Sequence, residues 1–112
     1  MSDKKNKLER WVTEQLLPID SKARPTRGSG CGNEIGDNSN KYLYIECKEK
    51  HTKSNIIMER SVWYHHLNGL PICTEKLPIY VTENKEREKF VTMSASDFFT
   101  MFKDYINLKE KQ

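Results

Sequence analysis

Three polar side chains in the first half of the chain could together carry out metal-assisted hydrolysis. Glu46 follows Asp37 by nine positions, and Lys48 comes two positions after Glu46. Carboxylate oxygens are the ligands that Mg²⁺ prefers, and a bound cation can activate a water molecule and offset developing negative charge. A lysine can orient or deprotonate that water. Hydrolysis of a phosphodiester needs such a set, so these residues are the candidates for chemistry.

The segment that carries Glu46 and Lys48 has the composition of a β-strand. Side chains at alternate positions of residues 41–48 point to opposite faces of such a strand. The apolar face then consists of Leu43, Ile45 and Cys47. Glu46 and Lys48 share the other face with Tyr42 and Tyr44, and their Cα atoms lie about 7 Å apart. We predict that the apolar face is buried and that the two charged side chains stay together.

A helix and a long loop precede this strand. Apolar residues recur at helical spacing over residues 3–17, and Pro18 ends the helix. These apolar residues are Leu8, Trp11, Val12 and Leu16. Residues 19–40 are rich in Pro, Gly, Ser and Asn, which predicts a loop with at most short strands. Loops of this length are usually functional, and Asp37 lies near the end of this one.

A second helix follows the strand. Its predicted range is 54–68, and Asn68 and Gly69 close it. The apolar stripe of this helix consists of Ile56, Ile57, Trp63, Tyr64 and Leu67. His65 and His66 diverge by about 100° around the helix axis, and no third metal ligand is evident, so we predict surface histidines.

A hairpin and a last helix complete the chain. Residues 77–82 and 90–93 predict two strands joined by an exposed, charged connection. Ser94 or Ser96 can cap the last helix. Its shared apolar face, which we predict to be core, consists of Phe98, Phe99, Met101, Phe102, Tyr105 and Ile106. The order of elements predicts an α/β or α+β fold with a central sheet.

The size and charge of the chain limit the number of domains it can form and the partners it can have. A length of 112 residues suits one domain over 1–112, with 1–5 and 108–112 as frayed tails. Four Phe, five Tyr and two Trp argue against disorder, although 31% of the residues are charged. The net charge of +3 does not by itself indicate a polyanion partner. Residues 22–33, however, contain three positive charges and no negative one.

The cysteines and the apolar runs exclude several classes of protein. Cys31, Cys47 and Cys73 are widely spaced and form no C-x-x-C pair, which indicates neither a zinc site nor a disulfide framework. No apolar run approaches the roughly 18 to 20 residues that span a bilayer, and no signal peptide is apparent. We therefore expect no membrane association and a cytoplasmic location.

The ordered set of motifs resembles the PD-(D/E)xK nuclease superfamily, in which an Asp and a variable spacer precede Glu-x-Lys on a strand. Here the motif is Asp37 followed by Glu46-Cys47-Lys48. With Arg27-Gly28-Ser29-Gly30 upstream, the chain is more specifically similar to small Holliday-junction resolvases of the archaeal and phage types. Gly36 stands where the motif usually has Pro. The resemblance implies a restriction-endonuclease-like domain with a central mixed sheet flanked by helices, and it suggests a phage or mobile-element origin with activity in the host cytoplasm.

The resemblance also implies a role for each matching residue. Asp37 and Glu46 would bind Mg²⁺, for which Mn²⁺ could substitute, and Cys47 would add its backbone carbonyl. Lys48 would act on the attacking water. The family uses a further glutamate on the first helix, for which we choose Glu9, because Glu14 points further from the apolar stripe. Glu34 could substitute as a ligand. The predicted DNA contacts are Arg24, Arg27, Ser29, Lys50 and Lys53.

These inferences predict a Mg²⁺-dependent endonuclease that acts on branched DNA as a homodimer, because symmetric cleavage of a four-way junction needs two sites. One alternative is a nicking or structure-selective nuclease of the same superfamily. A second is a catalytically inactive module that binds DNA through its basic residues. A third is an interaction protein that uses the aromatic last helix, which would expose an apolar patch and show no effect of metal.

Overall fold

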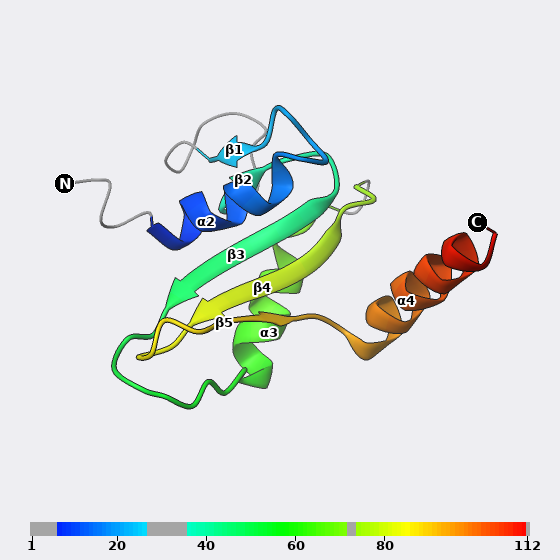
Figure 1. Ribbon diagram of the computed structural model, residues 1–112. Helices are drawn as coiled ribbons and strands as arrows, with labels where there is room; N and C mark the ends of the chain where they lie inside the picture. Colours follow the sequence, from blue (N-terminus) through cyan, green and yellow to red (C-terminus); the bar gives the residue numbers. More distant parts are fainter. Residues whose placement is uncertain (1–6, 27–35, 72–73, 112) are drawn as a thin grey trace.

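The computed structural model describes residues 7–26, 36–71 and 74–111. Arg27, Ser29 and Glu34 lie outside these residues. Along the described chain the elements are α2 (Lys7–Leu16), β1 (Arg24–Pro25), β2 (Asn38–Ser39), β3 (Leu43–Glu49), α3 (Arg60–Asn68), β4 (Leu77–Glu83), β5 (Lys89–Thr92) and α4 (Ala95–Glu110) (Figure 1). Over residues 19–26 and 36–40, the predicted loop with short strands is confirmed, because β1 and β2 have two residues each.

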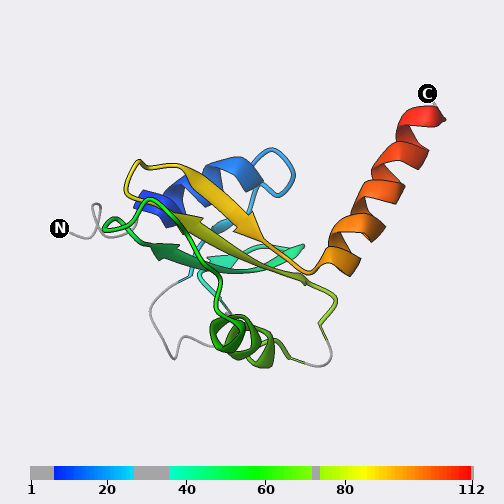
Figure 2. The same cartoon turned by 90° about the horizontal axis from the view of Figure 1, so that it is seen from below.

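The sheet is small and mixed. Its strand order is β3-β4-β5, with β3 parallel to β4 and β4 antiparallel to β5. Helix α3 makes the crossover that a parallel pair requires. Figure 2 shows α2 and α3 on opposite faces of the sheet. The predicted mixed α/β architecture with a central sheet is confirmed, as is the hairpin of β4 and β5.

The core lies between α2 and one face of the sheet. Leu8, Val12 and Leu16 of α2 are buried with Ile45 of β3 and with Ile79 and Val81 of β4, and Leu43 and Cys47 pack against this cluster. The prediction that the odd-numbered face of β3 is buried is therefore confirmed. The opposite face is covered as well, because Tyr44 is only 6% exposed. Burial on both faces is usual for strands in a parallel pair.

Helix α3 is shorter than the sequence predicts. It begins at Arg60, so the prediction of helix over residues 54–59 is wrong. The Asn84 side-chain amide donates to the Ser54 carbonyl at 2.9 Å, and the Ser54 hydroxyl donates to Glu86 at 2.6 Å. These bonds hold the segment against the β4–β5 turn in place of a helical turn. Ile57, assigned to the buried stripe, is 74% exposed.

Helix α4 projects from the rest of the domain (Figure 1). Ser94 caps it, as predicted, and accepts a hydrogen bond from the Asp97 amide at 3.1 Å. The helix runs to Glu110, into the predicted tail. None of its residues is buried, so the prediction that its aromatic face is core is wrong for the single chain. Amphipathic spacing indicates that a face can be covered, but not which surface covers it.

Within the described residues, no helix combines the length and the apolar character needed to cross a membrane.

Candidate functional site

The outer edge of β3 holds the side chain of Asp37 in a fixed position. β3 is an edge strand of the three-stranded sheet. The Asp37 amide donates to the Ile45 carbonyl at 2.6 Å, and the Asp37 carboxylate accepts from the Cys47 amide at 2.7 Å. Asp37 thus forms hydrogen bonds with the backbone of both neighbours of Glu46. These bonds place Asp37 beside Glu46.

Gly36 makes this close approach possible. Its φ angle is +70°, and a Cβ atom built there would lie 2.5 Å from the Ile45 carbonyl oxygen. Residues other than glycine are strained in this left-handed region, and here a side chain would also collide with the β3 backbone. The glycine that stands where the motif usually has proline is therefore required by the local geometry.

A buried hydrogen-bond chain connects α2 to the Asp37 segment. The Thr13 hydroxyl donates to the Glu9 carbonyl at 3.0 Å and accepts from the Asn38 side-chain amide at 2.7 Å. Asn38 is only 1% exposed and is bonded in turn to Asn40. Because Asn38 follows Asp37 directly, this chain ties the helical turn between Glu9 and Thr13 to the segment that carries Asp37.

The carboxyl groups of the site repel one another. Burial, the charge of Asp37 and a hydrogen bond with the Asp37 carboxyl raise the pKa of Glu46 to about 7. The neighbouring Lys48 opposes that shift. Burial, followed by the charges of Asp37 and Glu49, raises the pKa of Glu9. A cluster of this kind favours the binding of protons or cations over a fully ionised state.

Lys48 is exposed beside this cluster. An open cleft of about 260 Å³ is lined by Leu8, Glu9, Cys47, Lys48 and Glu49. Burial and the surrounding carboxylates raise the pKa of the Cys47 thiol, so the thiol stays protonated and is a poor metal ligand. Glu46 lines a different cleft with Tyr44, His66 and Tyr80, but it interacts electrostatically with Asp37, Lys48 and Glu9. Glu14 instead lines a separate pocket with Lys7, Arg10 and Trp11.

The described basic residues that were predicted to contact DNA flank the site. Arg24 lies in β1, whose next residue, Pro25, pairs with Asn38 beside Asp37. Lys50 and Lys53 lie in the turn that follows β3, where the Lys53 amide donates to the Lys50 carbonyl. Arg27 and Ser29 fall outside the described residues, so their predicted roles stay predictions.

His66 is a residue that sequence reasoning misplaced. It was predicted to be on the surface, but it is 3% exposed. Its ring stacks on Tyr44 with centroids 4.3 Å apart, meets Tyr80 edge-on, and bonds the Ile79 carbonyl through Nε2 at 2.8 Å. One signal of burial was missed: His66 lies one helical turn after Val62 and one turn before Gly69, so it shares a helix face with an apolar residue and a glycine. A Cβ atom at Gly69 would collide with the Tyr44 hydroxyl, so the β3 side chains pack closely against this face.

Burial, as the largest effect, lowers the pKa of His66. The unfolded chain therefore binds more protons than the folded chain just below the ordinary histidine pKa of about 6.5. The contribution of His66 to stability is complete above that pH and is lost as the pH falls towards the folded-state pKa.

We expect the free energy of unfolding of wild type, relative to His66→Gln, to fall between pH 7.5 and pH 5.5. The glutamine amide can still donate to the Ile79 carbonyl but does not titrate. Urea unfolding of both proteins at the two pH values measures the difference between their free energies of unfolding. The titration of Glu46 affects both proteins equally and therefore cancels in this difference. A constant difference would show that His66 does not stabilise the fold through its neutral form.

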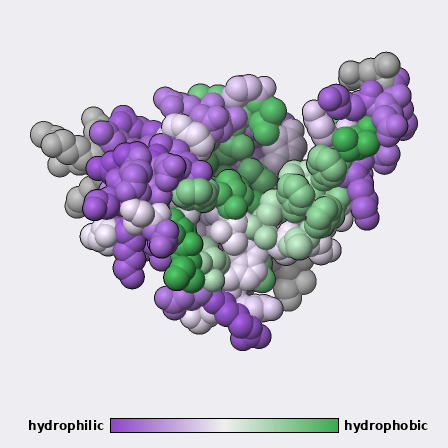
Figure 3. Space-filling model, turned by 60° about the horizontal axis from the view of Figure 1, so that its bottom comes forward, coloured by the Kyte–Doolittle hydropathy of each residue, from purple (hydrophilic) through white to green (hydrophobic). Residues whose placement is uncertain are grey.

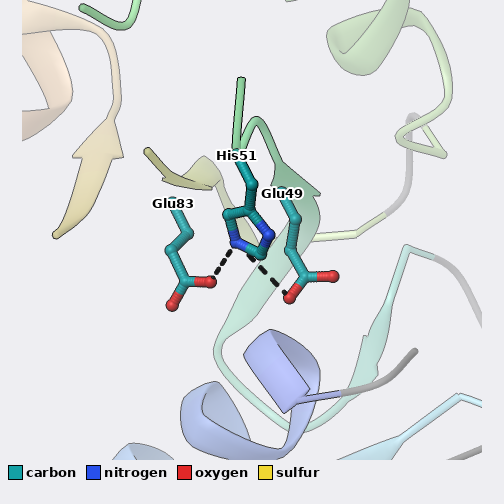
Figure 4. A group of neighbouring side chains, drawn as sticks. All are labelled: Glu49, His51 and Glu83. Carbon is teal, nitrogen blue, oxygen red and sulfur yellow. Dashed lines mark hydrogen bonds and ion pairs between the residues drawn. The ribbon is translucent and has the colours of Figure 1, made fainter. Parts of the chain in front are cut away.

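A second polar cluster lies at the ends of β3 and β4. Glu49, His51 and Glu83 form the one group of three His, Cys, Asp or Glu residues, within the described part of the chain, whose ligand atoms lie within 4.8 Å of one another (Figure 4). His51 Nε2 is 2.5 Å from the Glu83 carboxylate. This arrangement has the geometry to hold a cation, and the sequence analysis did not single it out.

The charges around Glu83 are already balanced. The Lys89 ammonium lies 2.9 Å from one Glu83 oxygen, and the Arg87 guanidinium lies 3.7 Å from the other. Burial alone would raise the pKa of Glu83, but the hydrogen bonds from Lys89 and His51 outweigh it and lower the pKa. A metal ion would have to displace these partners. Within the described residues, this cluster is therefore held together as an ion-pair network.

Comparisons with known protein families, with curated proteins and with solved structures found no match.

Proposed function

We propose that this chain is a metal-dependent DNA endonuclease of the PD-(D/E)xK type. The observation that carries the proposal is the pairing of the Asp37 and Glu46 carboxyls on the edge of β3, with Glu9 and Lys48 beside them. The fold supports it, because a helix, two short strands, the motif strand, a crossover helix and a parallel strand follow in the order expected of a restriction-endonuclease-like domain.

The donor set suits a divalent cation. The pKa of Glu46 is raised, and its carboxyl shares a hydrogen bond with the Asp37 carboxyl, so a metal ion could take the place of the shared proton. The N–H and C=O groups of one strand residue point to the same side, so the Cys47 carbonyl faces the outer edge with its amide. Asp37, Glu46 and this carbonyl would hold Mg²⁺ or Mn²⁺, with Glu9 near them. When bound, the cation would activate water and offset charge on the phosphate.

The remaining groups have separate roles in the proposal. The exposed Lys48 ammonium, on the same strand as Glu46, orients the attacking water and exchanges a proton with it. Arg24, Lys50 and Lys53 neutralise backbone phosphates on either side of the cleft. Branched DNA is the proposed substrate, and symmetric cleavage of a four-way junction would need two copies of the chain.

The proposal is tested by cleavage of a labelled four-way junction beside a matched linear duplex, with Mg²⁺, with Mn²⁺ or with chelator. We expect metal-dependent cutting of the junction and a loss of about 10²–10⁴-fold in Lys48→Ala, as for removal of a general acid or base. Lys41→Ala is the matched control, because Lys41 is an exposed lysine of the same segment.

Each outcome separates the candidate functions. Cutting of both substrates would indicate a general or structure-selective nuclease of the same type. Binding of DNA without cutting under any metal condition would indicate an inactive DNA-binding module. Equal activity of wild type and Lys48→Ala would remove Lys48 from the site.

A further inference from the structure

The face of α4 that carries the aromatic residues has no cover within the described chain. Six large apolar side chains of this helix are between 42% and 65% exposed. They are Phe98, Phe99, Met101, Phe102, Tyr105 and Leu108. Figure 3 shows hydrophobic side chains along one side of the projecting helix. Contiguous apolar patches of this kind usually mark an interaction site.

The spacing of these residues is that of a helix–helix seam. Phe98, Met101, Tyr105 and Leu108 follow one another at intervals of three, four and three residues, which is the repeat of a helix that packs against another helix. Phe102 stacks between Phe98 and Tyr105 beside this seam. An isolated helix of 16 residues is only marginally stable in water, so a packed partner is needed to hold it.

A second copy of α4 complements this helix in charge and in shape. In an antiparallel pair, the acidic first turn at Asp97 lies next to the basic end of the other helix at Lys109 and Lys111, and the helix dipoles oppose each other favourably. The same register places Phe98 opposite the partner's Leu108, and Met101 opposite the partner's Tyr105. Lys103, at the middle of the helix, lies on the face opposite the seam.

The available area is enough for a specific dimer. A covered aromatic side chain buries about 150–250 Å², so the five half-exposed side chains on and beside the seam offer roughly 500 Å² per copy. Two copies then bury on the order of 1,000 Å², at the lower limit for specific interfaces. On β5, Phe90 is 45% and Val91 is 57% exposed as well.

We infer that this chain forms a two-fold symmetric dimer through antiparallel packing of α4 against α4 of a second copy. The inference does not depend on the proposed nuclease activity. The sequence pattern predicts that the apolar face of α4 is buried. In the inferred dimer, α4 of the second copy covers this face.

Sedimentation velocity of the full chain between about 1 and 100 µM tests this inference. We expect wild type to sediment at twice the chain mass of 13.2 kDa. Tyr105→Glu places a charge in the seam and should weaken the dimer at least tenfold. Asn107→Glu adds the same charge on the opposite face of the same helix and should leave the dimer unchanged. Tyr105→Phe should also remain dimeric.

We expect the domain to keep its fold in all three variants, because no residue of α4 is buried against its own chain, and thermal unfolding of the variants checks this. A wild-type protein that stays monomeric at 100 µM would overturn the inference. In that case α4 would either fold back onto its own sheet or bind a different partner. Equal weakening by Tyr105→Glu and Asn107→Glu would also overturn it, because the face of the helix would not matter.

Discussion

At pH 8 and without metal, Glu46→Gln is expected to be more stable than wild type and, with Mg²⁺ added, to have lost cleavage. The ionised Glu46 carboxylate lies half-buried beside Asp37, which is why its pKa is raised to about 7. Replacing it with a neutral amide removes that repulsion. After allowance for solvent screening, the gain is about 1–2 kcal/mol. Loss of one group that stabilises the transition state costs about 10²–10³-fold in rate.

The sign of the pH dependence distinguishes this explanation from a general packing effect. The folded-state pKa of Glu46 lies above its unfolded value, so its contribution is fully present below about pH 4.5 and is lost as the pH rises to about 7. The advantage of Glu46→Gln over wild type should therefore grow over that range and then stay constant. Mg²⁺ should stabilise wild type above pH 7 and have little effect on the variant.

Thermal unfolding and junction cleavage measured on the same samples test both parts. Glu75→Gln, at an exposed glutamate before β4, is the control and should resemble wild type in both assays. A Glu46→Gln protein that is less stable than wild type at pH 8, or that cleaves normally, would remove Glu46 from the proposed site.

Gly36→Ala is expected to be among the most destabilising single substitutions in the described chain. An alanine at φ +70° costs about 1–2 kcal/mol in backbone strain alone. The methyl group would also lie 2.5 Å from the Ile45 carbonyl oxygen, so Asp37 must move away from β3. We expect a total loss of about 3 kcal/mol or more, which lowers the melting temperature by about 10 °C or more, together with loss of cleavage.

Gly69→Ala is the matched comparison. Its new methyl group would also collide with the Tyr44 hydroxyl, but the φ angle of Gly69 is an ordinary −79° and the neighbouring atom is the end of a side chain. We expect a smaller loss of stability and retained cleavage. Equal costs at the two glycines, measured by urea unfolding, would mean that backbone conformation at Gly36 contributes little.

Local patterns predicted the parts of the fold that depend on local periodicity. The alternation of Leu43, Ile45 and Cys47 identified the buried face of β3, and the spacing of Leu8, Val12 and Leu16 identified the buried face of α2. The same patterns failed where distant residues decide the outcome. Asn84 binds the Ser54 carbonyl from 30 positions away, and no pattern within residues 54–59 contains that information.

In the candidate site, too, local patterns predicted some features, whereas distant residues decided others. Residue types and spacing predicted that Asp37, Glu46 and Lys48 lie near one another, as they do, whereas the choice of Glu9 over Glu14 stays a prediction. The Thr13–Asn38 bond that ties α2 to the segment of Asp37 joins residues 25 positions apart and was not predicted. His66 was misplaced because a histidine does not contribute to an apolar stripe, although its ring packs as an aromatic residue here.

The attachment of Asp37 to β3 also protects the chain from self-assembly through its sheet. An edge strand with free amide and carbonyl groups can add a strand from another molecule, which is a common route to aggregation. Here Asp37 occupies the Ile45 carbonyl and the Cys47 amide, so the middle of that edge has fewer free hydrogen-bonding groups to offer. The segment that carries Asp37 thus also covers the outer edge of β3. Substitutions that loosen this segment should reduce the solubility of the protein as well as the proposed activity.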